Sequence, residues 1–162
     1  MSLNSGCQRS DTASRVIGAP PDTIYQAFSH PASLMQWLPP SGMSGRALEY
    51  DFRDGGRYRI ELRYEDGTST GSGKTTDRTD ITKGRFLQLV PGRRIKQSVE
   101  FESSDPTFAG EMTMTWSFEP APEGAIVTVT ADNVPSGISR ADRDAGLRSS
   151  LDNLAGPPGF GR

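Results

Sequence analysis

The chain has 162 residues, of which 33% are hydrophobic and 23% charged, and a formal net charge of −2, which suits one domain with a modest core. Because phosphate binding needs basic residues concentrated on one surface, the scattered arginines disfavour nucleic acid as a partner. A single cysteine and a single histidine exclude an internal disulfide and a histidine-based metal centre, so we expect no metal and no cofactor.

The N-terminal residues 1–12 are small and polar, and we expect them to be disordered. They have neither the basic start nor the apolar run of a signal peptide. No apolar run in the chain approaches the ~20 residues needed to span a bilayer. We therefore expect a cytoplasmic protein that does not insert into membranes.

A single domain is predicted over residues 13–156, followed by a tail at 157–162. Its first element is a short strand from Ser14 to Ile17, which two prolines end. Apolar residues at helical spacing then predict a helix that includes Ile24 to Phe28, with proline in its first turn. Ala32 to Trp37 is predicted to form a second short helix, closed by another pair of prolines.

From Arg46 onward apolar and charged residues alternate with a period of two. This predicts a long hairpin of two strands, Arg46 to Arg53 and Arg57 to Tyr64, joined by a glycine-containing turn. The polar stretch Thr68 to Thr82 is interpreted as a further strand, although its Ser, Thr and Gly content blurs the two faces. Phe86 to Val90 is predicted to be a separate strand.

Three more alternating runs follow, at Ile95 to Phe101, Met112 to Phe118 and Ile126 to Asp132. A final helix is predicted over Ser139 to Ala155, because Ser139 and Asp142 resemble an N-terminal capping pair before an apolar stripe. This order of elements predicts an α+β fold, in which a curved antiparallel sheet of six or seven strands wraps around the last helix. A sheet curved around one helix leaves an interior cavity suited to small molecules.

Six groups of residues carry a resemblance to a known family. They are Trp37-Leu38-Pro39-Pro40 with Gly42-Met43, Asp54-Gly55-Gly56 before Tyr58-Arg59, Phe86 to Pro91, Phe101-Glu102-Ser103 with Asp105-Pro106, Gly110 to Trp116, and Ala145-Gly146-Leu147 with Ser149-Ser150-Leu151. Together, over about Ser14 to Ala155, they resemble a bacterial branch of the SRPBCC, or START-related, superfamily. The branch is named after homologues of the ATPase activator of the ninety-kilodalton heat-shock chaperone.

The resemblance implies a helix-grip fold with a deep hydrophobic pocket, in a branch whose members mostly lack an assigned function. Two positions depart from the family pattern. Relatives often have His-Glu where Arg143-Asp144 stand, and their last helix commonly continues where Gly156-Pro157-Pro158 ends this one.

The candidate ligand-binding residues are the side chains that the alternation or the helical stripes turn inward. They are Phe28, Trp37, Tyr50, Phe52, Tyr58, Ile60, Leu62, Gln97, Val99, Phe101, Met114, Trp116, Leu147 and Leu151. Each of them could equally fill the core. For Trp37, just before a pair of prolines, the alternatives are a cap over the mouth of the pocket and a packing role.

No catalytic residue is expected, because charged side chains such as Glu49, Arg59 and Glu100 alternate outward. The stretch from Thr68 to Thr82 leaves one alternative open. Arg78 and Asp80 share a face there, which we interpret as solvated. If that face points inward instead, the two residues form a polar patch in a dry cavity.

Three hypotheses of function follow. The first is a binding protein for a small hydrophobic or amphipathic molecule, held between the sheet and the last helix. The second is an enzyme, cyclase- or hydrolase-like, that acts on such a ligand. The third, a chaperone- or stress-related interaction domain, rests on the family name alone, and chaperone contact is not expected. A homodimer paired through an exposed edge strand is left open.

Overall fold

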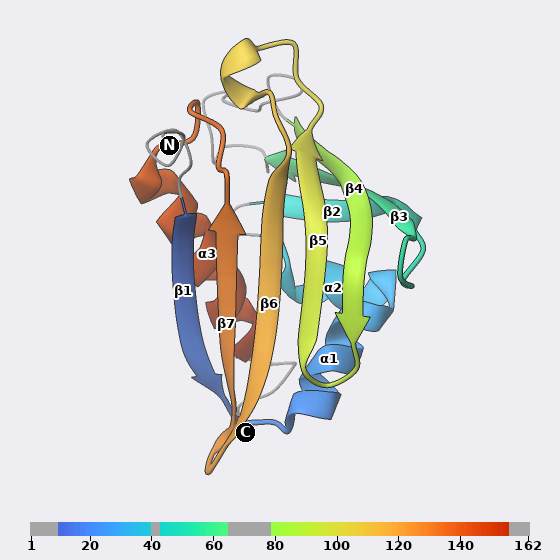
Figure 1. Ribbon diagram of the computed structural model, residues 1–162, viewed down its shortest axis with the longest axis vertical. Coiled ribbons are helices and arrows are strands. Elements are labelled where there is room, and N and C mark those ends of the chain that lie inside the picture. Colours follow the sequence, from blue (N-terminus) through green and yellow to red (C-terminus); the bar gives the residue numbers. More distant parts are fainter. Residues whose placement is uncertain (1–9, 40–42, 65–78, 156–162) are drawn as a thin grey trace, which may run out of the picture.

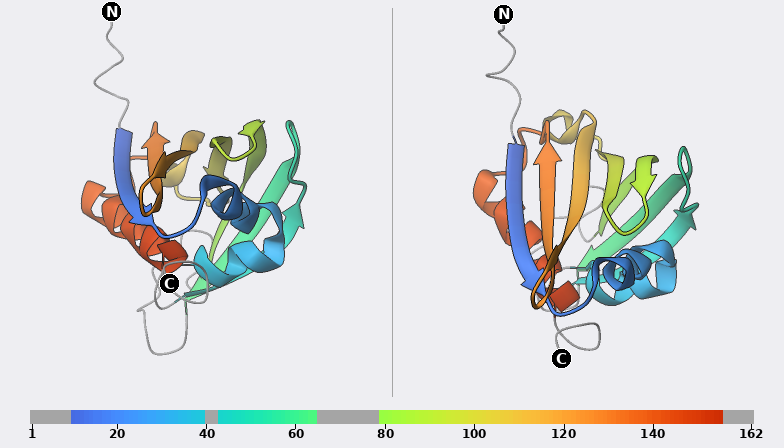
Figure 2. Two further views of the ribbon diagram at one scale, coloured as in Figure 1. Left: turned by 90° about the horizontal axis from the view of Figure 1, so that it is seen from below. Right: turned by 60° about the horizontal axis from the view of Figure 1, so that its bottom comes forward.

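A computed structural model of the protein describes residues 10–39, 43–64 and 79–155. Within these residues, an antiparallel sheet of seven strands curves around three α-helices, which lie on its concave side (Figures 1 and 2). In chain order the elements are β1 (Ser10–Ile17), α1 (Pro21–Ser29), α2 (Pro31–Trp37), β2 (Met43–Tyr50), β3 (Arg57–Tyr64), β4 (Thr79–Val90), β5 (Arg94–Phe101), a 3-10 turn η2 (Pro106–Phe108), β6 (Met112–Ala121), β7 (Gly124–Asp132) and α3 (Arg140–Ala155). The predicted α+β helix-grip architecture is confirmed.

The spatial order of the strands is β1-β7-β6-β5-β4-β3-β2. Strands β2 to β7 therefore form a meander in which each strand pairs with the next one along the chain. The first strand, β1, pairs with the last strand, β7. The sheet edges are β1 and β2. The predicted hairpin of β2 and β3 is confirmed, with Tyr50 opposite Tyr58 and Met43 opposite Tyr64.

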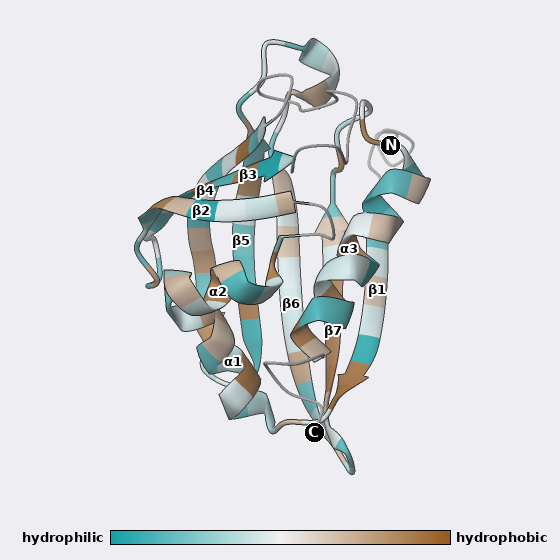
Figure 3. Ribbon diagram, turned by 180° about the vertical axis from the view of Figure 1, so that it is seen from behind, coloured by the Kyte–Doolittle hydropathy of each residue, from teal (hydrophilic) through white to brown (hydrophobic). Residues whose placement is uncertain are grey.

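The two short helices form because each has proline at its first turn and an apolar face toward the sheet. That face buries Ile24 and Phe28 from α1 and Leu34 and Trp37 from α2. In Figure 3, seen from behind, α1 and α2 lie in front of one half of the sheet and α3 in front of the other.

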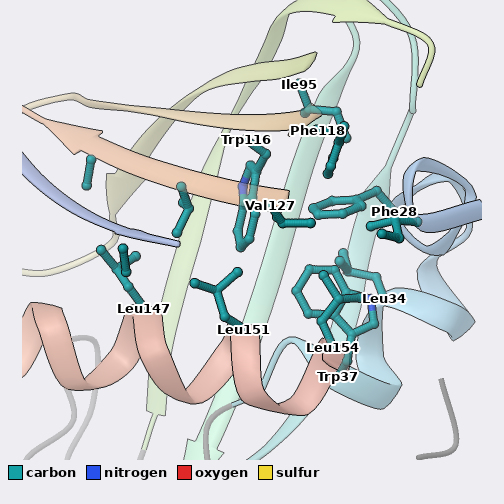
Figure 4. Packing of buried hydrophobic residues seen from close by; sticks show 14 of the residues in the cluster. Phe28, Leu34, Trp37, Ile95, Trp116, Phe118, Val127, Leu147, Leu151 and Leu154 are labelled. Atoms are coloured by element: carbon teal, nitrogen blue, oxygen red, sulfur yellow. The ribbon is translucent and has the colours of Figure 1, made fainter. Parts of the chain in front are cut away.

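Helix α3 begins as predicted. The hydroxyl of Ser139 accepts a hydrogen bond of 3.0 Å from the Asp142 main-chain nitrogen, which satisfies one free N–H of the first turn. The helix buries Leu147, Leu151 and Leu154 against the sheet (Figure 4). Only part of the surface of α3 is therefore buried in the core.

Strand β1 starts at Ser10, earlier than the predicted Ser14, because Ser10 to Ala13 continue the ladder opposite β7. Residues 10–12, which we expected to be disordered, thus belong to the sheet. The rest of that predicted segment and the predicted tail at 157–162 lie outside the described residues.

The prediction of separate strands at Thr68 to Thr82 and Phe86 to Val90 is wrong where the structure describes them, because β4 runs without a break from Thr79 to Val90. Gly84 makes this possible. A Cβ atom at that position would lie 1.9 Å from the main-chain oxygen of Ser98 in β5, so only glycine allows the two strands to approach there. Residues 68–77 of the predicted strand lie outside the described residues.

Candidate functional site

A cavity of about 750 Å³ lies between the concave face of the sheet and α3. Side chains from α1, α2, strands β2 to β6 and α3 form its walls. Protein interiors are packed so closely that they leave few voids larger than a water molecule. A space of this size is far larger than such voids, and it is the candidate site.

Most of the residues predicted from the sequence come together in the cavity wall. They are Phe28, Tyr50, Tyr58, Ile60, Leu62, Gln97, Val99, Phe101, Met114, Trp116 and Leu147. The alternation along β3, β5 and β6 is what places their strand members on the inner face. The helix residue Leu147 closes the opposite wall.

Three predicted residues lie outside the cavity wall. Trp37 is 5% exposed and packs edge-on against Phe28, with ring centroids 4.7 Å apart, so it has a packing role rather than that of a cap at the mouth. Phe52 follows the end of β2 and packs against Phe86 at 5.1 Å. Leu151 is 1% exposed and points into the core (Figure 4).

One end of the cavity is aromatic. The ring of Phe28 contacts Trp116 at 5.0 Å and Phe118 at 5.5 Å, and Trp37 lies behind them, 5.7 Å from Trp116. Edge-to-face packing of this kind holds the rings in fixed orientations. Figure 4 shows this cluster between α2, the sheet and the last turns of α3, where Leu34 and Leu154 complete it. The end is therefore a rigid, apolar wall.

Two tyrosines in the wall are tied to the main chain through their hydroxyl groups. Tyr58 donates to the Ser98 carbonyl at 2.5 Å, and Tyr50 donates to the Phe28 carbonyl at the end of α1, also at 2.5 Å. Burial raises the pKa of both phenols above the ordinary value of 10. Both side chains are therefore uncharged at neutral pH, and they add no charge to this part of the cavity.

The other end of the cavity carries charge. Asp80 is 6% exposed and lines the cavity, so the face that we interpreted as solvated points inward. Its cross-strand partner is Leu62, and Thr82 on the same face is opposite Ile60. The predicted companion of Asp80, Arg78, lies outside the described residues.

Sequence reasoning missed Arg143, which lines the same end from the first turn of α3. Its guanidinium carbon lies 6.0 Å from the centre of the Phe101 ring, a cation–π distance. The position follows the capping pair and precedes the apolar stripe, so helical spacing from Leu147 could have placed it on the inner side.

The partly exposed members of the wall show where the cavity meets the surface. Among them are Asp142, Ala145 and Gly146 on α3, and Met43 and Tyr64, which pair with each other at one end of the facing hairpin. Apart from its chain neighbours and the backbone of its own helix turn, a Cβ atom built on Gly146 meets no atom within 4 Å. Ala145 and Gly146 are thus small residues on this side of α3, and they leave room at the mouth.

The described residues contain no group of three or more His, Cys, Asp or Glu side chains that could hold a metal ion. In the same part of the chain, no helix is long and apolar enough to cross a membrane. Among the described residues, the cavity offers an apolar chamber with neutral tyrosines, the buried side chain of Asp80 and the guanidinium of Arg143.

Known proteins share the sequence pattern and the architecture of this chain. The family model for the Activator of Hsp90 ATPase homolog 1-like protein matches residues 18–156. A solved structure from Chromobacterium violaceum is 32% identical, with a TM-score of 0.79 over 90% of this chain and 94% of that chain. No match is found among curated proteins.

Two further solved structures are similar in fold. A protein from Rhodobacter sphaeroides is 18% identical, with a TM-score of 0.73 over 90% of this chain and 89% of that chain. The AHSA1-like protein from Aeromonas hydrophila is 17% identical, with a TM-score of 0.67 over 91% and 90%. The family match and the Chromobacterium structure together show that the chain belongs to the Activator of Hsp90 ATPase homolog 1-like family, with the helix-grip fold of the SRPBCC superfamily.

Proposed function

We propose that the protein binds a small hydrophobic or amphipathic molecule in the cavity between the sheet and α3. The observation that carries this proposal is the cavity itself, whose volume of about 750 Å³ falls within the range typical of small-molecule sites. The SRPBCC fold commonly binds hydrophobic ligands, which supports the same function.

The lining favours an apolar ligand over most of its length. Phe28, Trp116 and Leu147 offer only carbon surface and one indole N–H to the cavity, and Tyr50 and Tyr58 stay uncharged. Apolar surface that is removed from water on binding contributes roughly 25 cal/mol per Å² to the binding free energy, before the cost of association is subtracted. A molecule that fills the apolar chamber therefore gains most of its affinity there.

The test is a titration with N-phenyl-1-naphthylamine, an uncharged dye whose fluorescence rises in apolar surroundings. The variant Gly146→Phe places a ring at the mouth of the cavity. There is room for the ring, because a Cβ atom at this position meets nothing within 4 Å beyond its own helix backbone and chain neighbours. The matched control is Ala141→Phe, an exposed residue of the same helix outside the cavity wall.

Saturable dye binding is expected in the wild type and in Ala141→Phe, and at least a tenfold weaker affinity in Gly146→Phe. If the three proteins bind the dye equally, the dye occupies another surface and the cavity has no such role. Thermal melting of each variant shows that the fold is retained.

The inward position of Asp80 favours a second function, an enzyme acting on a ligand of the same kind. A carboxylate in an apolar cavity can exchange a proton with a bound substrate. Turnover of 4-nitrophenyl esters that disappears in Asp80→Asn, while dye binding persists, would support this function. Equal rates in the variant and the wild type would remove Asp80 from any reaction.

A further inference from the structure

Two polar side chains lie in the cavity wall beside its aromatic end. Gln97 from β5 and Trp116 from β6 both line the cavity. They are diagonal neighbours on adjacent strands, because Met114 is the cross-strand partner of Gln97 and Trp116 is two residues further along β6. Residues in this relation lie about 7–8 Å apart, within reach of long and aromatic side chains. The two polar groups can therefore contact one bound molecule.

The hydroxyl groups of the two tyrosines in the wall are already used. Tyr50 donates to the Phe28 carbonyl, and Tyr58 donates to the Ser98 carbonyl. A phenol has a single O–H, so neither tyrosine has a second hydrogen to donate to a ligand. Hydrogen bonding to a ligand at this end of the cavity therefore depends on the other polar side chains there.

The side-chain amide of Gln97 directs its nitrogen toward Tyr58. Burial raises the pKa of Tyr58, and a hydrogen bond from the Gln97 side chain opposes that rise. An amide donates through its nitrogen and accepts through its oxygen. Among the described residues, no group donates to the side-chain oxygen of Gln97. This oxygen is an acceptor that a molecule in the cavity can satisfy.

Trp116 supplies a hydrogen-bond donor. Its side chain is buried, and Figure 4 shows the indole projecting from β6 toward α3. A buried indole N–H usually has a hydrogen-bond partner, and that of Trp37 donates to the Ala27 carbonyl at 3.2 Å. Within the described part of the chain, the N–H of Trp116 has no such acceptor. It is thus left for a molecule in the cavity.

This pair of polar groups is separated from the charged side chain of Asp80. Phe86 in β4 is the cross-strand partner of Gln97 and follows Asp80 by six residues. Six residues of strand correspond to about 20 Å. The contacts of a ligand with Gln97 and Trp116 therefore do not depend on the charge at the other end of the cavity.

We propose, building on the binding function above, that the ligand carries a hydroxyl group that lies between Trp116 and Gln97. The hydroxyl oxygen accepts from the indole N–H, and the hydroxyl hydrogen is donated to the side-chain oxygen of Gln97. A ketone can accept from Trp116 but leaves the Gln97 oxygen without a donor. Because a buried acceptor without a donor costs free energy, the site selects an alcohol over a ketone of the same shape.

Displacement of N-phenyl-1-naphthylamine by cyclooctanol and by cyclooctanone tests the proposal. The two compounds share an eight-carbon ring and differ in whether the oxygen carries a hydrogen. The wild type is expected to bind cyclooctanol about fivefold more tightly than cyclooctanone, a ratio that one neutral hydrogen bond produces. The affinity of each variant for the dye is measured first, so that the displacement reports the affinity of the competitor.

Two variants remove the two polar groups one at a time. Gln97→Met removes the acceptor with little change of volume and is expected to bind the two compounds equally. Trp116→Phe removes the indole N–H and is expected to weaken both compounds about fivefold, because both accept from it. The matched control is Gln88→Met, at an exposed residue of β4 outside the cavity wall, which should keep the wild-type preference.

The outcomes separate this proposal from the binding function. If the dye binds but the wild type does not prefer cyclooctanol, the hydroxyl is wrong and the binding function stands. The same holds if Gln97→Met keeps the preference, or if Trp116→Phe binds both compounds as tightly as the wild type. If neither the dye nor either compound binds, both proposals are wrong. The wild-type order decides the question even if a variant fails to fold.

Discussion

Asn153, near the end of α3, donates a hydrogen bond of 3.1 Å to the main-chain carbonyl of Trp37 at the end of α2. The same amide nitrogen lies 2.9 Å from the Pro39 carbonyl. One side chain thus satisfies the carbonyl of the last residue of α2 and that of Pro39 just beyond the helix, and it fixes the short helices against α3. This connection lies beside the aromatic end of the cavity, where Trp37 packs against Phe28 and Trp116.

Replacing Asn153 with alanine should destabilise the fold by about 1–2 kcal/mol, because two partly buried carbonyls lose their donor. The adjacent Asp152→Ala serves as the control, since the partner of Asp152 among the described residues is Arg15, in an exposed ion pair, and it should cost less than about 1 kcal/mol. Urea unfolding of the two variants measures the difference. Equal losses would mean that Asn153 does not join the helices.

The glycines Gly84 and Gly146 should respond in opposite ways to alanine. A Cβ at Gly84 would lie 1.9 Å from the Ser98 oxygen, whereas one at Gly146 meets nothing within 4 Å. Gly84→Ala should therefore lose more than about 2 kcal/mol through overpacking. Gly146→Ala should gain about 0.5–1 kcal/mol, because alanine favours the helix. Thermal melting gives both signs, and a tolerated Gly84→Ala would contradict the close approach of β4 and β5.

Much of the fold can be read from the sequence, because the local signals agree with the packing. Alternation with a period of two fixes the inner face of β3, β5 and β6, and Ser139 caps α3 as its spacing with Asp142 indicates. The extent of β1 could not be predicted, because Ser10 to Ala13 carry no apolar signal and gain their strand from pairing with β7.

The inward position of Asp80 could not be predicted from the neighbouring residues in the sequence, for a similar reason. The residues around Asp80 are mostly polar, with Arg78 and Thr79 before it and Thr82 and Lys83 after it, so no alternation of apolar and polar residues shows which face is buried. Register decides it, since Asp80 pairs with the inward-facing Leu62. Trp37 and Leu151 show the converse limit, because an apolar inward residue can belong to the core or to a cavity wall, and only packing distinguishes the two.

The buried tyrosines predict how the protein responds to alkaline pH. Burial raises the folded-state pKa of Tyr50 and Tyr58 above 10. Their contribution to stability is thus complete below pH 10 and is lost as the pH rises, because the unfolded chain ionises first. In a pH jump to 11, absorbance at 295 nm should show a slow phase that accompanies unfolding. The variant Tyr58→Phe should reduce its amplitude, and an unchanged trace would contradict the burial of Tyr58.

On the outer face, Arg59 contacts Glu102 through two hydrogen bonds of 2.6 and 2.8 Å. The hydrogen bonds from the guanidinium lower the pKa of Glu102 below its ordinary value of 4.5. The pair therefore stabilises the fold above that pH, and its contribution disappears as acid protonates Glu102. The difference in melting temperature between wild type and Glu102→Gln should shrink from pH 7 to pH 3. A constant difference would show that the pair has no part in acid stability.

The most direct test of the binding function is native mass spectrometry of freshly purified protein, followed by solvent extraction and identification of any bound molecule. We expect a stoichiometric adduct on the wild type and on Ala141→Phe that is absent from Gly146→Phe, whose new ring occupies the cavity mouth beside an open Cβ position. An adduct of equal abundance on all three proteins would place the ligand outside the cavity and contradict the account.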